Sequence, residues 1–293
     1  MLKNFLKRRE ISKKIELLDP EKDNQEIVYL LACHCFPNDV ERSLEFGFFR
    51  TFAVPSISRL LASTGEFRNR TKKRYDDTEL IMYEIIENGH DSERAMKAFQ
   101  RMNSMHGSFD ISNDDFLYVL STFIFIPIFW LDKFAWRKPS RKEKRAIFHF
   151  FREVGLKMNI KNIPKDYREF KAFHMKYEKE NFKFSESNRA VAEYTRDLLI
   201  GFFLPKQLNF VGRSITNCLM DDPLLDAMGY NKPNPILKAF VMIFLRVRMW
   251  FMSILGDRKK AVYGTTKKRS SYPKGYNIED LGTFPNKVFS SVA

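Results

Sequence analysis

One histidine lies where its imidazole could do chemistry. His106 ends the series Ala95, Phe99, Met102 and His106, whose steps of four, three and four residues place them on one face of a helix. An imidazole on such a stripe is most often a hydrogen-bonded core residue. The functional alternative is an axial ligand of a haem iron, which needs an imidazole fixed on a helix among apolar side chains. Gly107 follows directly and would let the chain turn.

Arg74 and Thr78 form a second candidate pair, four residues apart on one helical face. A guanidinium keeps its charge, so on an apolar stripe it must find an anion. One interpretation pairs Arg74 with a carboxylate at the start of the same helix: Asp76, Asp77 or Glu79. The other pairs it with a carboxylate of a ligand, such as a haem propionate, or sets it beside bound dioxygen with Thr78 donating a hydrogen bond.

Other potential sites are weaker. Glu87-x-x-His90 resembles half of a di-iron carboxylate site, but the sequence has no second copy. Cys33-His34-Cys35 places three potential ligands together, and no other cluster completes a metal site. The sequence has no Walker loop and no G-x-G-x-x-G, H-E-x-x-H or G-x-S-x-G motif. The remaining histidines are interpreted as core or surface residues: His34, His90, His149 and His174.

The composition is that of a globular protein. Of 293 residues, 44% are apolar and 29% are charged, which excludes a polytopic membrane protein. Phe is unusually frequent, with 29 residues, and indicates an aromatic interior or an apolar ligand pocket. Four residues are candidates for a pocket wall, although core packing would explain them too: Phe123, Phe125, Phe129 and Trp130.

Cysteine content and the N-terminal sequence predict the compartment. Three cysteines are too few for a disulfide framework, so a reducing environment is the simpler interpretation. The N-terminal residues are basic without an apolar run behind them, which predicts neither a secretory signal nor an N-terminal anchor. We therefore expect a cytoplasmic protein, with peripheral membrane contact as an option.

Apolar residues recur at helical spacing almost throughout, which predicts an all-α fold. Gly89 and Ser92 mark the end of one helix and the cap of the next. The expected helices span residues 22–34, 40–49, 53–64, 76–88, 91–106, 112–136, 140–157, 166–182, 187–202, 206–219 and 233–256.

Two apolar segments raise the question of a membrane. Residues 116–131 carry no charge but are short for a bilayer crossing, and we interpret them as a buried helix. Residues 236–255 include Lys238, Arg246 and Arg248, which favours a helix lying on a membrane surface or the last core helix. Basic clusters at 137–145 and 258–269, in a chain of formal charge +14, are either a solvated face or a contact for anionic phospholipid. They match no nucleic-acid-binding module, so no nucleic acid is expected.

A series of short motifs resembles the MpaB and latex-clearing (rubber oxygenase) family of haem b oxygenases, from about residue 45 to 285. Each motif is weak alone, but their order and spacing together are specific. The motifs are Arg74-Tyr-Asp-Asp-Thr78, Ser92-Glu-Arg-Ala, Arg101-Met-Asn-Ser-Met-His106-Gly, Ile163-Pro164, Tyr177-Glu178, Tyr272-Pro-x-Gly-Tyr276 and Leu281-Gly-Thr283.

The resemblance implies one helical domain with a globin-like core around a haem b. It implies an oxygenase that uses dioxygen to cleave carbon-carbon double bonds of a hydrophobic, isoprenoid or alkene substrate. By position, His106 matches the axial histidine, and Arg74 and Thr78 match an arginine and a threonine of the haem pocket. Rubber-cleaving members also have a distal glutamate ahead of the arginine, for which Glu66 is the nearest carboxylate but at a different spacing.

The domain organisation that follows is an N-terminal basic helical extension (1–44), an oxygenase catalytic domain (45–285) and a C-terminal tail (286–293). Two other functions stay open. A non-catalytic peripheral membrane or lipid-binding protein would use the basic clusters and residues 236–255. A haem-carrying or haem-sensing protein would share His106 but form no oxygen-dependent product.

Overall fold

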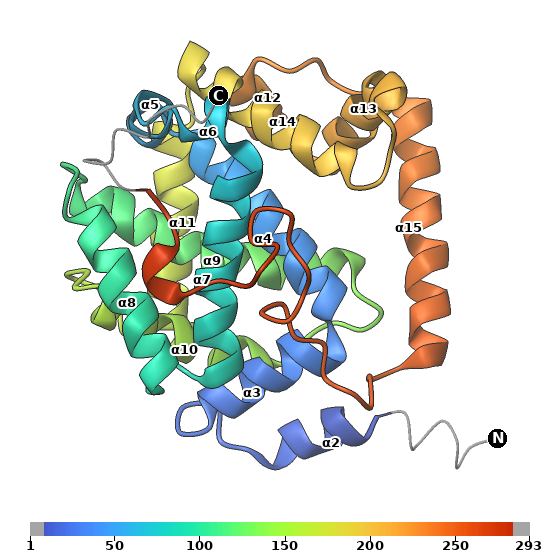
Figure 1. Cartoon of the computed structure of the whole chain (residues 1–293). Helices are drawn as coiled ribbons and strands as arrows, with labels where there is room; N and C mark the ends of the chain where they lie inside the picture. Colours follow the sequence, from blue (N-terminus) through green and yellow to red (C-terminus); the bar gives the residue numbers. More distant parts are fainter. Residues whose placement is uncertain (1–8, 284–293) are drawn as a thin grey trace.

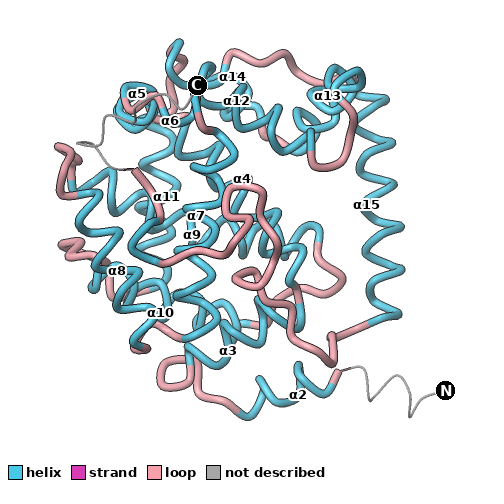
Figure 2. Tube along the Cα trace, viewed as in Figure 1, coloured by secondary structure: helices cyan, strands magenta, loops and turns pink. Residues whose placement is uncertain are grey.

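A computed structural model describes residues 9–283, and within that range the chain forms helices and loops without strands (Figures 1 and 2). The predicted all-α fold is confirmed, whereas the globin-like character of its core stays a prediction. The predicted tail, 286–293, lies outside the described residues. The α-helices are α2 (Glu10–Leu17), α3 (Asn24–Leu30), α4 (Pro37–Phe52), α5 (Pro55–Ser63), α6 (Glu66–Asn69), α7 (Thr71–Asn88), α8 (Glu93–His106), α9 (Asn113–Phe134), α10 (Arg141–Lys157), α11 (Tyr167–Asn181), α12 (Glu186–Gly201), α13 (Asn209–Leu219), α14 (Asp222–Met228) and α15 (Pro235–Leu255). A π-helical turn, η1 (Leu31–Cys35), extends α3, and two 3-10 turns are η2 (Lys206–Leu208) and η3 (Ile278–Asp280).

The apolar helix α9 lies at the centre, and α4, α10 and α11 pack against it (Figure 1). Tyr118, Ile124 and Phe125 of this helix are fully buried. It is the one helix in residues 9–283 that is long and apolar enough to cross a membrane, but 72% of its apolar window is buried inside the protein. The prediction of a buried helix over residues 116–131 is therefore confirmed.

Two clusters of apolar side chains form the core. The larger cluster contains side chains from α3 and from all of the helices between α7 and α11. It also includes Ile15 and Ile27 from the N-terminal part of the chain. The smaller one joins α4, α12 and α14 and includes Phe49, Val191 and Leu225. Helices before residue 45 thus share a core with those after it, and the division of the chain near residue 44 stays a prediction.

Helices α7 and α8 form an antiparallel pair joined by a short turn. Gly89 has a positive φ of 81° and ends α7, while the Ser92 side chain accepts a hydrogen bond from the Ala95 amide at 3.1 Å and caps α8. Arg74 lies about four turns before the end of α7, and His106 about four turns after the start of α8. The turn at Gly89 therefore brings both residues to the same end of the pair.

Several helix boundaries differ from those expected. Helix α7 begins at Thr71 rather than near residue 76, and its N-cap, Arg70, makes no side-chain capping bond that could have marked the start. Helices α2, α6 and α14 are four to eight residues long and were not predicted. Elements of this length carry too few turns for a clear apolar period.

Residues 256–283, hereafter the C-terminal strap, run across the faces of α7 and α8 (Figure 1). The strap starts at the π-helical turn, whose carbonyls at Cys33 and His34 accept hydrogen bonds from the amides of Val262 and Arg258 at 2.9 and 3.0 Å. Cys33-His34-Cys35, a weak metal candidate in the sequence, is thus a docking point for the strap.

Candidate functional site

His106 lies in the last turn of α8 with its ring mostly buried. Its Nδ1 atom is buried and has no hydrogen-bond partner in the described part of the chain, and the ring meets the edge of Phe116 with centroids 5.3 Å apart. Burial, together with the positive charge of Arg74, lowers the pKa of His106 from its usual value to about 4. At neutral pH the imidazole is therefore uncharged, which is the form that binds a metal ion.

Arg74 and Thr78 meet on α7 as the four-residue spacing predicts. The Arg74 guanidinium donates to the Thr78 hydroxyl, which in turn donates to the Arg74 carbonyl at 3.1 Å. The guanidinium also lies over the ring of Phe67, 5.5 Å from its centroid. The charge of Arg74 acts on His106, so α7 and α8 bring together the three residues singled out in the sequence.

Of the two interpretations of Arg74, the one that pairs it with a carboxylate at the start of its own helix is wrong. Within residues 9–283 no carboxylate lies within ion-pair distance of this guanidinium, because the three candidates are taken by other partners. Asp76 pairs with Lys72 and Arg269, Asp77 with Lys73 and Tyr272, and Glu79 with Arg269.

Burial lowers the pKa of the Arg74 guanidinium, and only the more distant charges of Asp77 and Glu66 oppose that shift. Glu66 is itself buried and pairs with Arg70. Arg74 is thus a partly buried cation without a bonded anion among the described residues. Such a group is expected to attract the carboxylate of a ligand.

The start of α9 is fixed next to His106. Asp115, which precedes Phe116, accepts hydrogen bonds from Ser56 at 2.9 Å and from Tyr177 at 2.5 Å. These bonds tie α9 to α5 and α11, so the Phe116 ring is held against the imidazole. Sequence reasoning missed Phe116 and Phe67, since both are ordinary apolar residues until the helices are placed.

The end of the C-terminal strap packs against the C-terminal part of α8, close to His106. Arg101 donates to the carbonyls of Leu281 and Thr283 at 2.6 and 2.9 Å. Gly282 between them has a φ of 86°, and a Cβ atom there would lie 2.0 Å from the sulfur of Met105, the residue before His106. The Leu281-Gly-Thr283 motif therefore packs on the helix that carries the imidazole.

The four aromatic residues proposed for a pocket wall pack elsewhere in the core. Phe125 contacts Tyr167 and Phe170, Phe123 stacks on Phe151, and Trp130 packs on Phe46. Phe125 is nine residues beyond Phe116, or about 13 Å along α9. Core packing, the alternative weighed for these residues, accounts for their contacts, including the one between Phe129 and Phe125.

Three of the other four histidines, and Glu87 of the weaker motifs, have structural partners. His34 bonds the Arg258 carbonyl, His90 the Asn24 side chain and His174 the Ser121 hydroxyl. Glu87 bonds Gly264 and Thr265 of the strap. Across residues 9–283 no group of three or more His, Cys, Asp or Glu side chains is arranged to hold a metal ion.

The residues at the end of the α7–α8 pair fit a haem by their donors. They offer a neutral imidazole with an unpartnered nitrogen and a cation without a bonded anion. Two hollows in the described part of the chain, of about 300 and 30 Å³, lie elsewhere and are lined by none of Arg74, Thr78 and His106.

Fold and site together define an all-α protein with a largely buried, uncharged histidine at one end of a helix pair. The chain belongs to the family described as ER-bound oxygenase mpaB/B'/rubber oxygenase, catalytic domain, which matches residues 46–253. It is 30% identical over 244 residues to the ER-bound oxygenase mpaB' of Penicillium brevicompactum, covering 77% of this chain and 57% of that protein. It is also 30% identical over 213 residues to the ER-bound oxygenase mpaB of Penicillium roqueforti, covering 67% and 71%. The chain thus spans little more than half the length of the first of these relatives.

The low pKa of His106 can be measured directly in the protein without added cofactor. We expect its imidazole to titrate near pH 4, and we expect Arg74→Gln to move that pKa upward because a nearby positive charge is removed. NMR titration of the ring protons measures both values. His149, on α10, serves as the internal reference and should not respond to Arg74→Gln. A His106 pKa near 6.5 in both proteins would contradict the burial of this imidazole close to Arg74.

Proposed function

We propose that this chain is a haem b-dependent oxygenase that cleaves a carbon-carbon double bond of a hydrophobic, isoprenoid or alkene substrate. The proposal is supported by membership of an oxygenase family and by the neutral imidazole of His106 with its unpartnered Nδ1 atom. That imidazole is the observation on which the proposal depends most. The haem, when bound, would supply the chemistry that activates dioxygen.

Each residue of the site has a separate task in this proposal. His106 would bind the haem iron, because burial keeps its imidazole uncharged at neutral pH and an uncharged imidazole has one nitrogen with a free lone pair. Arg74 would bind a propionate of the haem or donate a hydrogen bond to dioxygen, and Thr78 holds the guanidinium by accepting its hydrogen bond while donating to the Arg74 carbonyl. Phe67 and Phe116 would exclude water from the two polar groups.

A reconstitution experiment separates this proposal from its alternatives. The full chain, purified with haem, should show a Soret band and should bind carbon monoxide after reduction, since an oxygenase needs an open iron position. Incubation with an isoprenoid alkene in oxygen should then yield carbonyl products. Haem binding without an oxygen-dependent product would favour a haem carrier, and no haem binding would contradict the proposal.

A second property, docking on an anionic membrane, is proposed from the surface of α15. None of its residues is buried, and its outward side carries only apolar residues apart from Arg246 at the edge: Ile236, Ala239, Phe240, Ile243, Phe244, Val247, Trp250, Phe251 and Ile254. Phe240 and Phe244 are 66% and 70% exposed. The alternative that residues 236–255 form the last core helix is therefore wrong.

The charged residues of α15 show which way the helix faces. Lys238 and Arg248 lie on its half-buried side, and Arg248 pairs with the buried Asp39 of α4 at 2.9 Å. This polarity is the reverse of that of a soluble surface helix, whose charges face water. An apolar outward face with basic residues at its edge and just after the helix is typical of a helix that lies in the interface of a bilayer.

Charge favours a lipid surface over a second copy as the partner of this face. Arg258, Lys259 and Lys260 follow the helix and are exposed, and the whole chain carries a formal charge of +14. Two copies would repel each other, whereas anionic phospholipid would attract this end of α15. The relatives are also described as ER-bound.

Substitutions on α15 test the docking surface. We expect Phe240→Ser with Phe244→Ser to weaken binding to phosphatidylcholine vesicles containing phosphatidylserine by about tenfold or more, because two large apolar side chains no longer leave water. Co-sedimentation measures the bound fraction. The matched control is Leu17→Ser with Leu156→Ser, two exposed apolar residues on α2 and α10, which should bind as the unmodified chain does. Unchanged binding in the α15 variant, or a salt-stable dimer instead, would contradict this surface.

A further inference from the structure

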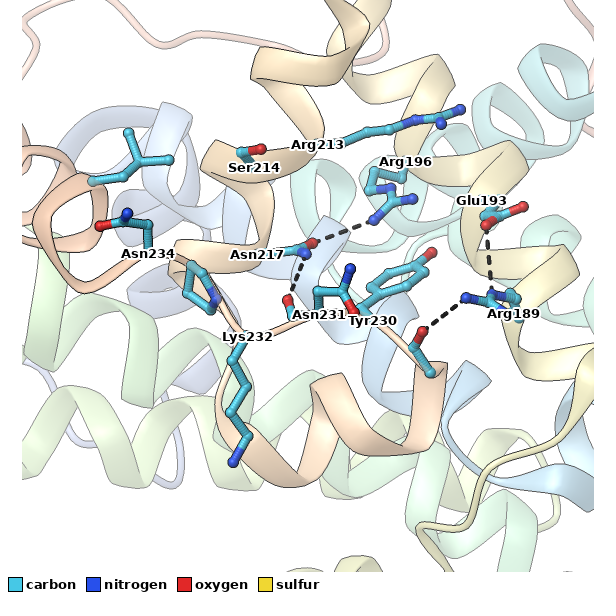
Figure 3. A pocket seen from close by; sticks show the side chains of 13 residues that line it. Arg189, Glu193, Arg196, Arg213, Ser214, Asn217, Tyr230, Asn231, Lys232 and Asn234 are labelled. Atoms are coloured by element: carbon cyan, nitrogen blue, oxygen red, sulfur yellow. Dashed lines mark hydrogen bonds and ion pairs between the residues drawn. The ribbon is translucent and has the colours of Figure 1, made fainter.

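A pocket of about 300 Å³ lies between α12, α13 and the linker 229–234 that leads into α15. Four of the side chains around it are cations: Arg189, Arg196, Arg213 and Lys232. Figure 3 shows Arg196 over the ring of Tyr230, with a dashed line joining it to Asn217. Neither the family relationship nor the proposed haem site gives these residues a role.

Arg196 is the unusual member of the set because it is buried and only partly bonded. Its side chain stacks on Tyr230, with the guanidinium carbon 3.8 Å from the ring centroid, and it donates one hydrogen bond to Asn217 at 3.3 Å. Arg196 is 5% exposed and Tyr230 is 8% exposed. The Nε atom of Arg196 and the hydroxyl of Tyr230 are both buried without a hydrogen-bond partner among the described residues. Both groups are therefore buried hydrogen-bond donors without an acceptor in the described part of the chain.

The uncompensated charge of the pocket belongs to Arg196. Each of the other three cations has a carboxylate partner: Arg213 with Asp197, Lys232 with Asp222 and Arg189 with Glu193. No carboxylate in residues 9–283 lies within ion-pair distance of Arg196. Burial accordingly lowers the pKa of its guanidinium, and a bound anion would offset that cost.

The start of α15 adds to the positive potential. Asn234 caps this 21-residue helix by accepting a hydrogen bond from the Ile236 amide at 2.8 Å, and Asn234 and Leu237 both line the pocket. The positive end of the helix dipole therefore lies beside the space that the cations surround. Glu193 is the one carboxylate that lines the pocket, and its partner Arg189 lies at 3.7 Å.

We propose that this pocket binds a phosphate group, with Arg196 and Tyr230 as its buried donors. A guanidinium edge and a hydroxyl suit the several oxygens of a tetrahedral anion, and Lys232 and Arg189 lie at the rim, where they can add donors. The phosphate could be free or the headgroup of a phospholipid. The pocket lies beside the first turn of α15, the helix proposed to dock on the membrane, and the test below separates the two sources of phosphate. The inference concerns a second site and does not depend on haem.

Calorimetric titration of the full chain tests the site with three probes. These are inorganic phosphate, the soluble short-chain lipid dihexanoyl phosphatidate and its choline analogue, dihexanoyl phosphatidylcholine. We expect saturable binding of phosphate and phosphatidate, weakened about tenfold or more in Arg196→Gln because a charge-assisted hydrogen bond is lost. Arg168→Gln removes an exposed arginine of α11 and should leave binding unchanged.

The comparison of probes identifies the source of the phosphate. Tighter binding of phosphatidate than of phosphate and of the choline lipid supports a headgroup, and equal binding of phosphate and phosphatidate supports a free phosphate. Lys232→Gln alters only an exposed rim residue, so it provides a weakened variant even if the buried substitution at Arg196 prevents folding. Absence of saturable binding by either phosphate or phosphatidate, or equal affinity in the unmodified chain and both variants, would overturn the proposal.

Discussion

His106→Ala is expected to remove the Soret band of the haem-loaded protein, together with its oxygen-dependent activity. Within residues 9–283, the His106 imidazole has an unbonded nitrogen at the end of the α7–α8 pair, and its low pKa keeps it uncharged at neutral pH, the form that would bind iron. Loss of an outer partner of a metal ligand already costs about 10–100-fold in metal affinity or activity, so loss of the ligand itself should cost more. Visible spectroscopy during haem titration measures the change.

Two controls distinguish the loss of an iron ligand from a folding defect of the variant. His149→Ala removes a half-exposed histidine of α10 and should leave the spectrum unchanged. Free imidazole added to His106→Ala should restore a Soret band, because the side chain leaves a space of its own shape beside Phe116. A His106→Ala protein that binds haem as tightly as the unmodified chain would show that another residue is the ligand.

The parts of the structure that follow from local periodicity were predictable. The apolar stripe ending in His106 and the Ser92 cap place α8 correctly, and the Arg74–Thr78 spacing gives the observed pair on α7. The ion-pair partner of each charged side chain could not be predicted from the sequence. Asp76 and Glu79 stand close to Arg74 along the chain, yet both bond Arg269, almost 200 residues away.

The C-terminal strap connects short motifs that lie far apart in the sequence. Tyr272 bonds Asp77 of the first motif, and Arg101 of the third motif bonds Leu281 and Thr283 of the last one. These residues contact one another across the site, so their spacing reflects one structural unit. The strap has no helical period of its own. Its contacts with α7 and α8 can therefore be recognised only in the three-dimensional structure.

The orientation of α15 was open in the sequence for a different reason. Its apolar residues surround the helix, so periodicity alone cannot choose between core and membrane surface. The ion pair between Arg248 and Asp39 decides which side faces the protein, and that contact joins residues 209 positions apart. Long-range charge pairs thus settle what local patterns leave undecided in both α7 and α15.

Arg269→Met is expected to destabilise the protein by about 3–5 kcal/mol, the usual cost of removing one partner from a buried ion pair. Arg269 is 8% exposed, and it bonds Asp76, which is fully buried, and Glu79, which is 9% exposed. Methionine would fill much of the volume but leave Glu79 without a bonded cation. The free energy of unfolding from urea titration measures the loss, and Arg258→Met, an exposed position of the strap, should change it little.

The pH dependence of this defect identifies its cause. Burial already raises the pKa of Glu79 above its usual value despite Arg269, and removing the arginine would raise it further. A raised folded-state pKa means that the folded protein binds the proton more tightly than the unfolded chain, so stability is regained as pH falls. The deficit of Arg269→Met should therefore be larger at pH 8 than at pH 5. Adding Glu79→Gln should recover part of it at pH 8. A deficit that is equal at both pH values would mean that lost packing, rather than a stranded carboxylate, loosens the strap from the helix that carries Arg74.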